Sequence, residues 1–216
     1  MNGYKYILFD LDGTLTDPKE GITRSVAYAL EKMGIEAPEL DELCKFIGPP
    51  LKDSFMHFYG MSETDAQTAV SKYREHFSQG GLFQNVVYEG MPELLKSLKS
   101  QGKTLIVATS KPQAFAKQIL DHFGLSQYFE FVSGSEFDGT RVKKAEVIEH
   151  ALRECRIDDR SSAVMVGDRS YDVIGAKENG LACIGVLYGY GSREELQEAG
   201  ADHIVETISE LKDLLI

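Results

Sequence analysis

The sequence predicts an α/β protein: a Rossmann-like parallel sheet core with an α-helical domain inserted after the first strand. From about Lys103 onward, short apolar runs alternate with helix-like segments, as in a parallel sheet covered on both faces. A further apolar run, Tyr6 to Phe9, lies near the N-terminus. Between these two regions the chain has helical periodicity and no evident buried strand. We therefore expect residues 1–15 and 87–216 to form the core domain and residues 16–86 the helical domain.

The first predicted strand leads directly into a polar octet, Asp10-Leu11-Asp12-Gly13-Thr14-Leu15-Thr16-Asp17. If the strand continued regularly, Asp10 and Asp12 would lie on one side and Leu11 on the other, before Gly13 supplies a turn. Clustered carboxylates repel one another, so a fold keeps them where a cation neutralises them or where one carries a proton. An aspartate can also act as a covalent nucleophile, as in enzymes that form an aspartyl-phosphate. The octet therefore favours phosphoryl transfer over a simple polar turn.

The next region predicts four helical segments. The first has an apolar stripe and ends at Gly34, two more span Glu39 to Phe46 and Leu51 to Phe58, and the fourth opens at Ser62, whose hydroxyl suits an N-cap. The stripe consists of Ile22, Val26, Leu30 and Met33. Gly80-Gly81 then interrupts the pattern.

The rest of the chain supplies the other strands and their helices. The apolar runs are Leu105 to Ala108, Phe129 to Val132, Ala163 to Val166 and Ala182 to Leu187. Proline suits the first turn of a helix and glycine its C-terminal end, which assigns Pro92 and Pro112 to helix starts and Gly102, Gly124, Gly180 and Gly200 to helix ends.

Polar residues collect where these strands end. Thr109, Ser110 and Lys111 follow the strand from Leu105, so their polar groups and the next helix N-terminus would face the crevice at the carboxyl edge of the sheet. Lys143-Lys144 precedes a helix-like segment, and a lysine there could neutralise the charge on a nucleophile and a phosphate. That helix-like segment runs from Ala145 to Cys155.

Two further aspartates follow the strand from Ala163 to Val166. Gly167 allows a sharp turn, and Asp168 and Asp172 are four residues apart. If a helix begins near Arg169, the two carboxylates converge near the strand end.

The composition narrows the classes of protein. The chain has 216 residues, 43% of them hydrophobic, which is ample material for a packed core. A formal net charge of -11 disfavours a nucleic-acid scaffold, because polyanion binding relies on surplus lysine and arginine. Cys44, Cys155 and Cys183 are few and widely spaced, which favours free thiols in a reducing compartment. We find no export leader and no apolar stretch long enough for a membrane span, so we expect a cytoplasmic protein without a membrane partner.

Taken in order, these polar groups resemble the four motifs of the haloacid dehalogenase-like superfamily, over almost the full chain. The first motif of its phosphatase branch reads Asp-x-Asp-Gly-Thr, and residues 10–14 match it completely. By this resemblance Asp10 attacks phosphorus, Asp12 serves as general acid and base, and Gly13 and Thr14 join the phosphate-binding residues. The dehalogenase branch lacks the second carboxylate, so Asp12 favours phosphate chemistry. The resemblance also implies that the inserted helices form a cap that closes over the active site.

The second and third motifs carry over to the lysine-containing segments. Thr109 matches the second-motif hydroxyl, with Ser110 and Lys111 as secondary phosphate contacts. The third motif needs one lysine. Similar sequences that read Arg-x-x-Lys before the helix favour Lys144, but the adjacent Lys143 leaves the register open, and the Lys-Pro form frequent in the family is missing here.

The fourth motif has the form Gly-Asp-x-x-x-Asp, and its aspartates bind magnesium in the family. Asp10, Asp168 and the backbone carbonyl of Asp12 become the inner Mg²⁺ ligands by resemblance, with Asp172 close or linked through water. Hard oxygen ligands of this kind are those that Mg²⁺ prefers.

The resemblance implies a Mg²⁺-dependent phosphomonoester hydrolase that forms an aspartyl-phosphate and acts on a small phosphorylated metabolite, most similar to the phosphoglycolate phosphatases. A 5'-nucleotidase of the same superfamily and a beta-phosphoglucomutase-like phosphotransferase are alternatives that share these motifs. A non-catalytic response module that binds metal and carries a phospho-aspartate is an alternative of another class, against which Asp12 and the helical insertion argue. The sequence leaves open whether the protein is a monomer or a weak dimer, and whether Arg24, Lys52 and Arg74 of the cap face the substrate.

Overall fold

The computed structural model describes residues 3–216, and the chain divides into two compact units. The core unit contains the chain up to Asp17 together with Val87–Ile216, and the helical unit contains Pro18–Val86. The chain passes between them through β2 (Thr16–Asp17) and β3 (Val86–Val87), which pair with each other. The first crossing lies two residues later than the sequence predicts, because Thr16 and Asp17 belong to a strand that stays with the core unit.

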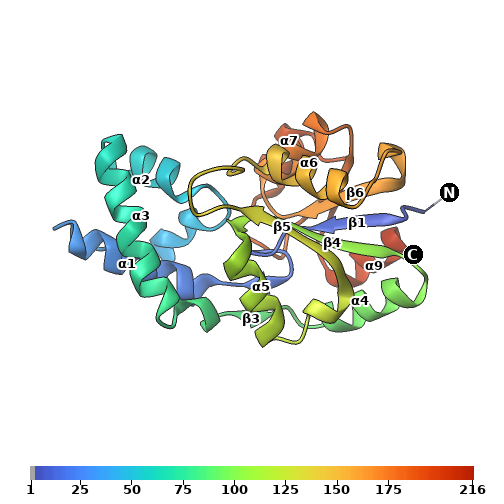
Figure 1. Ribbon diagram of the computed structural model, residues 1–216, viewed down its shortest axis with the longest axis horizontal. Helices are drawn as coiled ribbons and strands as arrows, with labels where there is room; N and C mark the ends of the chain where they lie inside the picture. Colours follow the sequence, from blue (N-terminus) through green and yellow to red (C-terminus); the bar gives the residue numbers. More distant parts are fainter. Residues whose placement is uncertain (1–2) are drawn as a thin grey trace. The chain divides into compact units, whose positions relative to one another are not determined.

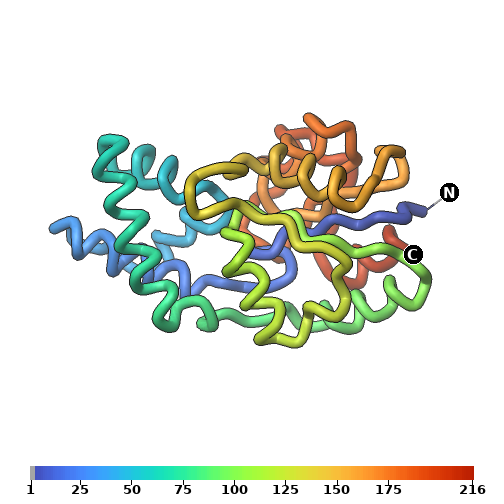
Figure 2. The backbone as a smooth tube through the Cα atoms, viewed as in Figure 1, coloured from blue at the N-terminus to red at the C-terminus, as the bar shows by residue number. Residues whose placement is uncertain are grey.

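The core unit is built on a six-stranded sheet with the order β5-β4-β1-β6-β7-β8, and every neighbouring pair is parallel. β1 lies between β4 and β6, where the tube in Figure 2 shows the blue strand at the centre. The predicted α/β fold class is therefore confirmed. The strands are β1 (Tyr6–Phe9), β4 (Thr104–Pro112), β5 (Phe129–Ser135), β6 (Ala163–Gly167), β7 (Ala182–Val186) and β8 (His203–Val205). β8 is not evident in the sequence, since three residues with an exposed histidine make no apolar run.

Helices cover both faces of this sheet (Figure 1). α6 and α7 pack on one face, with α8 beside α7, while α4, α5 and α9 lie on the other. Their bounds are α4 (Met91–Ser100), α5 (Gln113–His122), α6 (Lys144–Glu154), α7 (Ser170–Glu178), α8 (Arg193–Ala199) and α9 (Ile208–Leu215), with short 3-10 turns at Ser126–Tyr128 and Arg160–Ser162. The four glycines expected at helix ends all have positive φ, as glycine after a helix commonly does.

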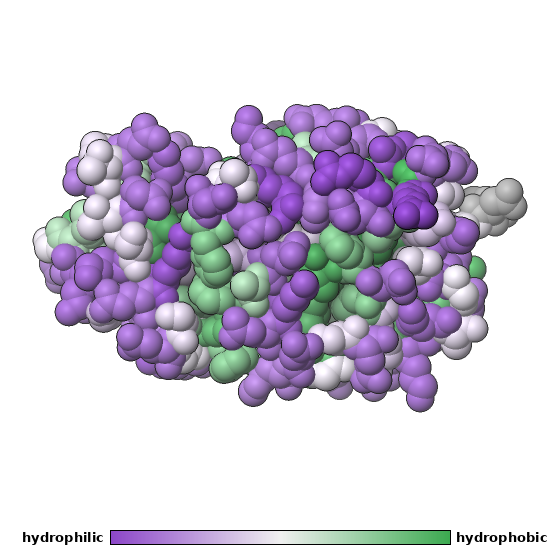
Figure 3. All heavy atoms as spheres, in the orientation of Figure 1, coloured by the Kyte–Doolittle hydropathy of each residue, from purple (hydrophilic) through white to green (hydrophobic). Residues whose placement is uncertain are grey.

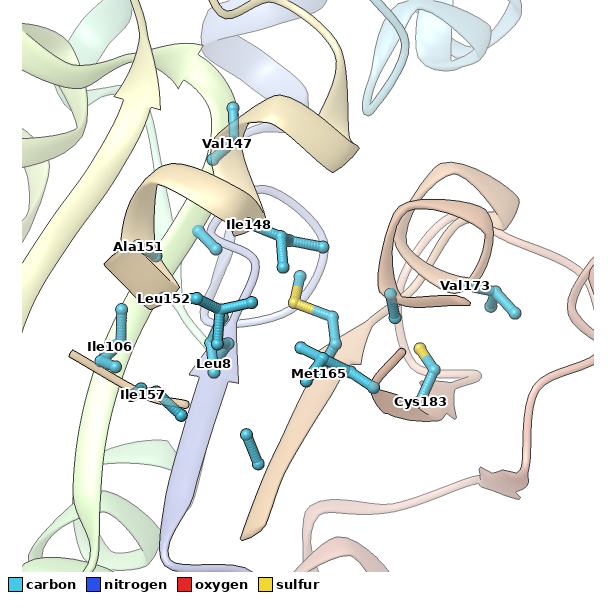
Figure 4. Close-up of a cluster of buried hydrophobic side chains, with 14 of the residues drawn as sticks. Leu8, Ile106, Val147, Ile148, Ala151, Leu152, Ile157, Met165, Val173 and Cys183 are labelled. Atoms are coloured by element: carbon cyan, nitrogen blue, oxygen red, sulfur yellow. The ribbon is translucent and has the colours of Figure 1, made fainter. Parts of the chain in front are cut away.

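Alternation along the strands decides which face each side chain joins. Leu8 and Met165 point toward α6 and pack against Ile148 and Leu152, as Figure 4 shows. Each of these side chains is almost fully buried, and burial of one such side chain contributes about 1.5–3 kcal/mol to folding. The packed layer under α6 fixes the start of that helix against the carboxyl edge of the sheet, where the polar motifs lie.

β4 departs from its expected course. The strand does not stop at Ala108: its pairing with β5 is irregular after Ala108 and resumes where Pro112 pairs with Ser135. Pro112 is consequently the N-cap of α5 and not part of its first turn. Thr109, Ser110 and Lys111 therefore lie in an irregular segment of a strand, where their side chains need not alternate.

The helical unit packs around its own apolar residues. Its elements are α1 (Lys19–Lys32), a 3-10 helix (Leu40–Phe46), α2 (Leu51–Tyr59), α3 (Glu63–Ser78) and a 3-10 turn (Gly81–Phe83). The second predicted segment is thus a 3-10 and not an α-helix. Ile22, Val26 and Leu30 of the predicted stripe are buried, whereas Met33 is half-buried and caps α1. Phe46 packs its ring 5.0 Å from that of Phe55.

Charged and polar residues dominate the face of the molecule drawn in Figure 3, with apolar groups in patches between them. Within residues 3–216, every helix is too short or too polar to traverse a lipid bilayer.

Candidate active site

The first motif turns sharply out of the sheet. The Asp10 N–H still donates to Val166 O at 2.9 Å, but β1 ends at Phe9 and the chain does not continue as a regular strand. Instead the carbonyl of Leu11 accepts from the amides of Leu15 and Thr16 at 2.9 and 3.0 Å, which closes a tight turn. The chain therefore does not continue as the regular strand that would place Asp10 and Asp12 on one face. The two carboxylates have different ion-pair partners, Lys144 for Asp10 and Lys111 for Asp12.

Asp10 is only 4% exposed, and one of its oxygens is held from two directions. The Leu11 N–H donates to Oδ1 at 2.7 Å, and Lys144 Nζ lies 2.8 Å from the same oxygen. Both contacts therefore fix the carboxylate through Oδ1.

Lys144 begins α6 and is 6% exposed. Its ammonium lies 2.8 Å from Asp10 Oδ1 and 2.8 Å from Asp172 Oδ1, and it donates to Ala108 O at 3.1 Å. Lys143 is exposed and serves as the N-cap of α6, and its backbone N–H donates to Glu146 Oε2 at 3.3 Å. Of the two adjacent lysines, the structure brings Lys144 into the carboxylate cluster and leaves the Lys143 side chain outside it.

Asp168 follows β6 and is fully buried. It accepts from the Thr14 hydroxyl at 3.2 Å and from the Tyr190 N–H at 2.8 Å. The backbone at Gly13 has φ 81° and runs so close that a Cβ there would lie 2.2 Å from Asp168 Oδ2. Gly13 and Thr14, which are predicted to bind phosphate, both contact the Asp168 carboxylate.

Asp172 lies in the first turn of α7 and is 1% exposed. Its Oδ2 accepts from the Arg169 N–H at 3.1 Å, while Oδ1 faces Lys144. Asp10, Asp168 and Asp172 each offer an oxygen within 4.8 Å of the others. The three carboxylates come from the ends of β1 and β6, the point where the strand order reverses and where open α/β sheets bind ligands.

Asp12 has a partner of its own outside that group of three. Lys111 Nζ lies 2.9 Å from Asp12 Oδ2, and both residues are buried. The Lys111 N–H donates to Thr109 Oγ1 at 3.2 Å. Ser110 is half-buried, and its carbonyl accepts from the Ser135 hydroxyl at 2.8 Å.

Burial shifts several pKa values at this edge. Burial raises the pKa of Asp12, although the Lys111 ammonium opposes it. Burial raises the pKa of Asp168 well above its ordinary value, and the Asp172 and Asp10 carboxylates add to the rise. Burial likewise raises the pKa of Asp172 to about 6, against the lowering effect of Lys144. For Lys144, burial lowers the pKa, but the Asp10 and Asp172 carboxylates outweigh it and the pKa is raised on balance.

The charges of these groups do not balance among the described residues. Four buried carboxylates, Asp10, Asp12, Asp168 and Asp172, face two ammonium groups, Lys111 and Lys144. With all four carboxylates ionised, two negative charges remain, and one divalent cation would neutralise them. Asp12 Oδ1 is also buried without a hydrogen-bond partner. The three clustered carboxylates provide the hard oxygen ligands that suit Mg²⁺, so the residues present fit that ion.

One part of the site was not anticipated from the sequence. The loop from Leu187 to Gly191 follows β7, and its Tyr190 N–H is a direct partner of Asp168. The signal available in the sequence was the alternation of glycine and tyrosine in Tyr188-Gly189-Tyr190-Gly191, directly after a predicted strand.

Comparisons with known proteins agree with this geometry. A family model described as haloacid dehalogenase-like hydrolase matches residues 7–186. The chain belongs to this family. A 5'-nucleotidase of Pseudomonas aeruginosa is 50% identical over 212 residues, covering 98% of this chain and 96% of that protein. The relatives also include the tyrosine-protein kinase PtkA of Mycobacterium tuberculosis, 39% identical over 97% of this chain and 72% of that protein.

More distant relatives and solved structures extend the family. A phosphoglycolate phosphatase of Vibrio parahaemolyticus is 28% identical over 98% of this chain and 96% of that protein. The crystal structure of a predicted phosphatase from Clostridium acetobutylicum superposes with a TM-score of 0.95 at 52% identity, covering 97% of each chain. Family membership together with these phosphatases identifies the chain as a haloacid dehalogenase-like phosphatase.

Proposed function

We propose that the chain is a Mg²⁺-dependent phosphomonoesterase that works through an aspartyl-phosphate at Asp10, with nucleoside 5'-monophosphates as its first candidate substrates. The observation that carries the chemistry is the contact of Lys144 with both Asp10 and Asp172, beside a separate pair of Asp12 and Lys111. This arrangement places an ammonium group against the carboxylate that attacks, and the raised pKa of Asp12 favours a proton on that second carboxylate.

In the first step an oxygen of Asp10 attacks phosphorus, and the bond between phosphorus and the ester oxygen breaks. Protonated Asp12 gives its proton to the departing oxygen, so the alcohol leaves neutral. Lys111 holds the Asp12 carboxyl in place through Oδ2. The two contacts to Asp10 Oδ1 restrict rotation of that carboxylate. The restriction favours in-line attack of the Asp10 oxygen on phosphorus.

In the second step Asp12, now a carboxylate, takes a proton from water. The water oxygen bonds to phosphorus, the bond to the Asp10 oxygen breaks, and inorganic phosphate leaves. Thr109 Oγ1 accepts from the Lys111 amide, so its own proton is available to donate to a phosphoryl oxygen. Asp10, Asp168 and Asp172 would hold Mg²⁺, which supplies positive charge to the phosphoryl oxygens.

The substrate class rests on the comparisons. The relative named 5'-nucleotidase is 50% identical over 98% of this chain, so the similarity includes the helical unit, which the family resemblance makes a cap over the active site. The sequence alone favours phosphoglycolate as the first candidate substrate, so the comparisons reverse the order of the two candidates. Phosphoglycolate is the second candidate, supported by a relative that is 28% identical over 98% of the chain.

Hydrolysis assays with the full chain test this proposal. Para-nitrophenyl phosphate, uridine 5'-monophosphate and 2-phosphoglycolate are each assayed with Mg²⁺ and with a chelator. We expect Mg²⁺-dependent release of phosphate, fastest with the nucleotide among the two natural esters. Mass spectrometry of acid-quenched protein should find phosphate on the peptide that contains Asp10, and not in the Asp10→Asn variant. Release of phosphate at an equal rate in the chelator would refute the metal assignment.

A further inference from the structure

The loop from Leu187 to Gly191 is packed against Asp168 as closely as a backbone allows. The Tyr190 N–H donates to Asp168 Oδ2 at 2.8 Å. A Cβ on Gly189 would lie 2.4 Å from Asp168 Cβ, and one on Gly191 would lie 1.9 Å from Asp168 O. Neither position has room for a side chain, so the two glycines let the loop reach the carboxylate.

The same loop also holds the connection through β2. The Tyr190 hydroxyl donates to Asp17 Oδ1, and Asp17 is the last residue of the core unit before the chain enters the helical unit. A single residue therefore contacts Asp168 with its backbone and Asp17 with its side chain.

The connection through β3 is held beside it. The ring of Tyr188 packs edge-on against Tyr88, with 5.0 Å between ring centroids and 65° between planes. Tyr88 directly follows β3, and its N–H donates to Leu15 O at 3.3 Å. Burial, with nearby carboxylates such as Asp168, raises the pKa of both Tyr88 and Tyr188, so both stay neutral phenols.

We propose that Tyr190 is a positioning residue that couples the metal-binding carboxylate Asp168 to the connecting strand β2. The proposal rests on the proposed function, because it takes Asp168 as a Mg²⁺ ligand. A shift of Asp17 would move the Tyr190 side chain. The Tyr190 backbone N–H, which donates to Asp168 Oδ2, would then move with it and shift the carboxylate. Coupling between two sites is reciprocal in free energy, so Mg²⁺ at Asp168 should in turn stabilise β2.

The first test is Mg²⁺ binding, measured by isothermal titration calorimetry on the full chain. Tyr190→Phe removes the hydroxyl and keeps the amide bond to Asp168, and Asp17→Ala removes the partner. Since one hydrogen bond contributes about 0.5–1.5 kcal/mol, we expect each variant to bind Mg²⁺ about two- to tenfold more weakly. The double variant should bind no more weakly than the weaker single variant. Tyr128→Phe, which removes a tyrosine hydroxyl elsewhere in the core unit, is the matched control and should leave binding unchanged.

The second test is hydrogen exchange with and without Mg²⁺. In the wild type, Mg²⁺ should slow amide exchange in residues 15–17 and 86–88, and Tyr190→Phe should reduce that protection. Thermal melting establishes that each variant is folded at the assay temperature. If Tyr190→Phe is not, Asp17→Ala carries the same comparison.

Each failure has its own signature. Wild-type Mg²⁺ affinity and wild-type exchange in Tyr190→Phe would overturn the coupling while leaving the metal site intact. Additive losses in the double variant would also overturn it, because the two groups would then act independently. A wild-type protein that binds no Mg²⁺ would overturn the proposed metal site, and this inference with it.

Discussion

Replacing Lys144 by methionine tests the centre of the site. Methionine keeps an unbranched apolar stem but removes the ammonium that lies 2.8 Å from Asp10 and 2.8 Å from Asp172. The variant leaves the four buried carboxylates with one ammonium group in place of two, so the site becomes more negative by one charge. The incoming phosphate dianion then meets a less positive site.

The expected loss follows from that change. Removal of one preorganised group that stabilises transition-state charge typically costs about 3–4 kcal/mol, so kcat/KM should fall by about 10²–10³. Breaking a buried ion pair costs about 3–5 kcal/mol of stability. Protonation of Asp172, whose pKa is about 6, offsets part of this cost near neutral pH. At about 2–4 °C per kcal/mol for a chain of this size, we expect a Tm lower by about 5–10 °C without metal.

Lys143→Met is the matched control. The Lys143 side chain is exposed, and its backbone N–H keeps its bond to Glu146 in the variant. We expect kcat/KM within about twofold of wild type and a stability change within about 0.5 kcal/mol. Steady-state kinetics and thermal melting of both variants decide the matter. If Lys143→Met had the larger kinetic effect, or if both effects were small, the third-motif lysine would not be Lys144.

Further predictions concern the carboxylates. Asp10→Asn should abolish turnover with the fold intact and an equal or higher Tm without metal, because one crowded carboxylate is removed; wild-type turnover would disprove the nucleophile assignment. Asp168→Ala should weaken Mg²⁺ binding by more than about tenfold in calorimetry, whereas Asp12→Ala should still bind Mg²⁺ but lose activity. Unchanged Mg²⁺ affinity in Asp168→Ala would contradict the ligand assignment. The pKa of Asp172 is about 6 in the folded state and lower in the unfolded state, so the folded state binds this proton more tightly. The stability that the proton contributes is therefore lost as pH rises through about 6. In chelator, the Tm of the wild type should therefore fall more between about pH 5 and pH 7.5 than the Tm of Asp172→Asn, and identical slopes would refute the shift.

The sequence alone was sufficient for the fold class and the family. Apolar runs such as Tyr6 to Phe9 and Ala163 to Val166 are buried on both faces of a parallel sheet, so they read as continuous runs and not as alternating ones. The polar motifs follow these runs directly, and the carboxyl ends of parallel strands meet at one edge. Short or irregular elements were less predictable, as in β8 and the segment after Ala108, because their pairing depends on neighbours distant in sequence.

Tertiary structure alone decided which groups meet. Adjacent lysines look equivalent in a sequence. In the fold, α6 packs its apolar face on Leu8 and Met165, which fixes the orientation of the helix about its own axis. In that orientation Lys144 faces Asp10 and Lys143 faces solvent. The turn after β1 likewise pairs Asp12 with Lys111, and the loop after β7 brings Tyr190 onto Asp168 across 22 residues of chain. Local periodicity specifies which residues share a face of an element. Which side chain on another element a residue contacts depends on the orientation in which the two elements pack. That orientation is determined by the apolar side chains of the core between them.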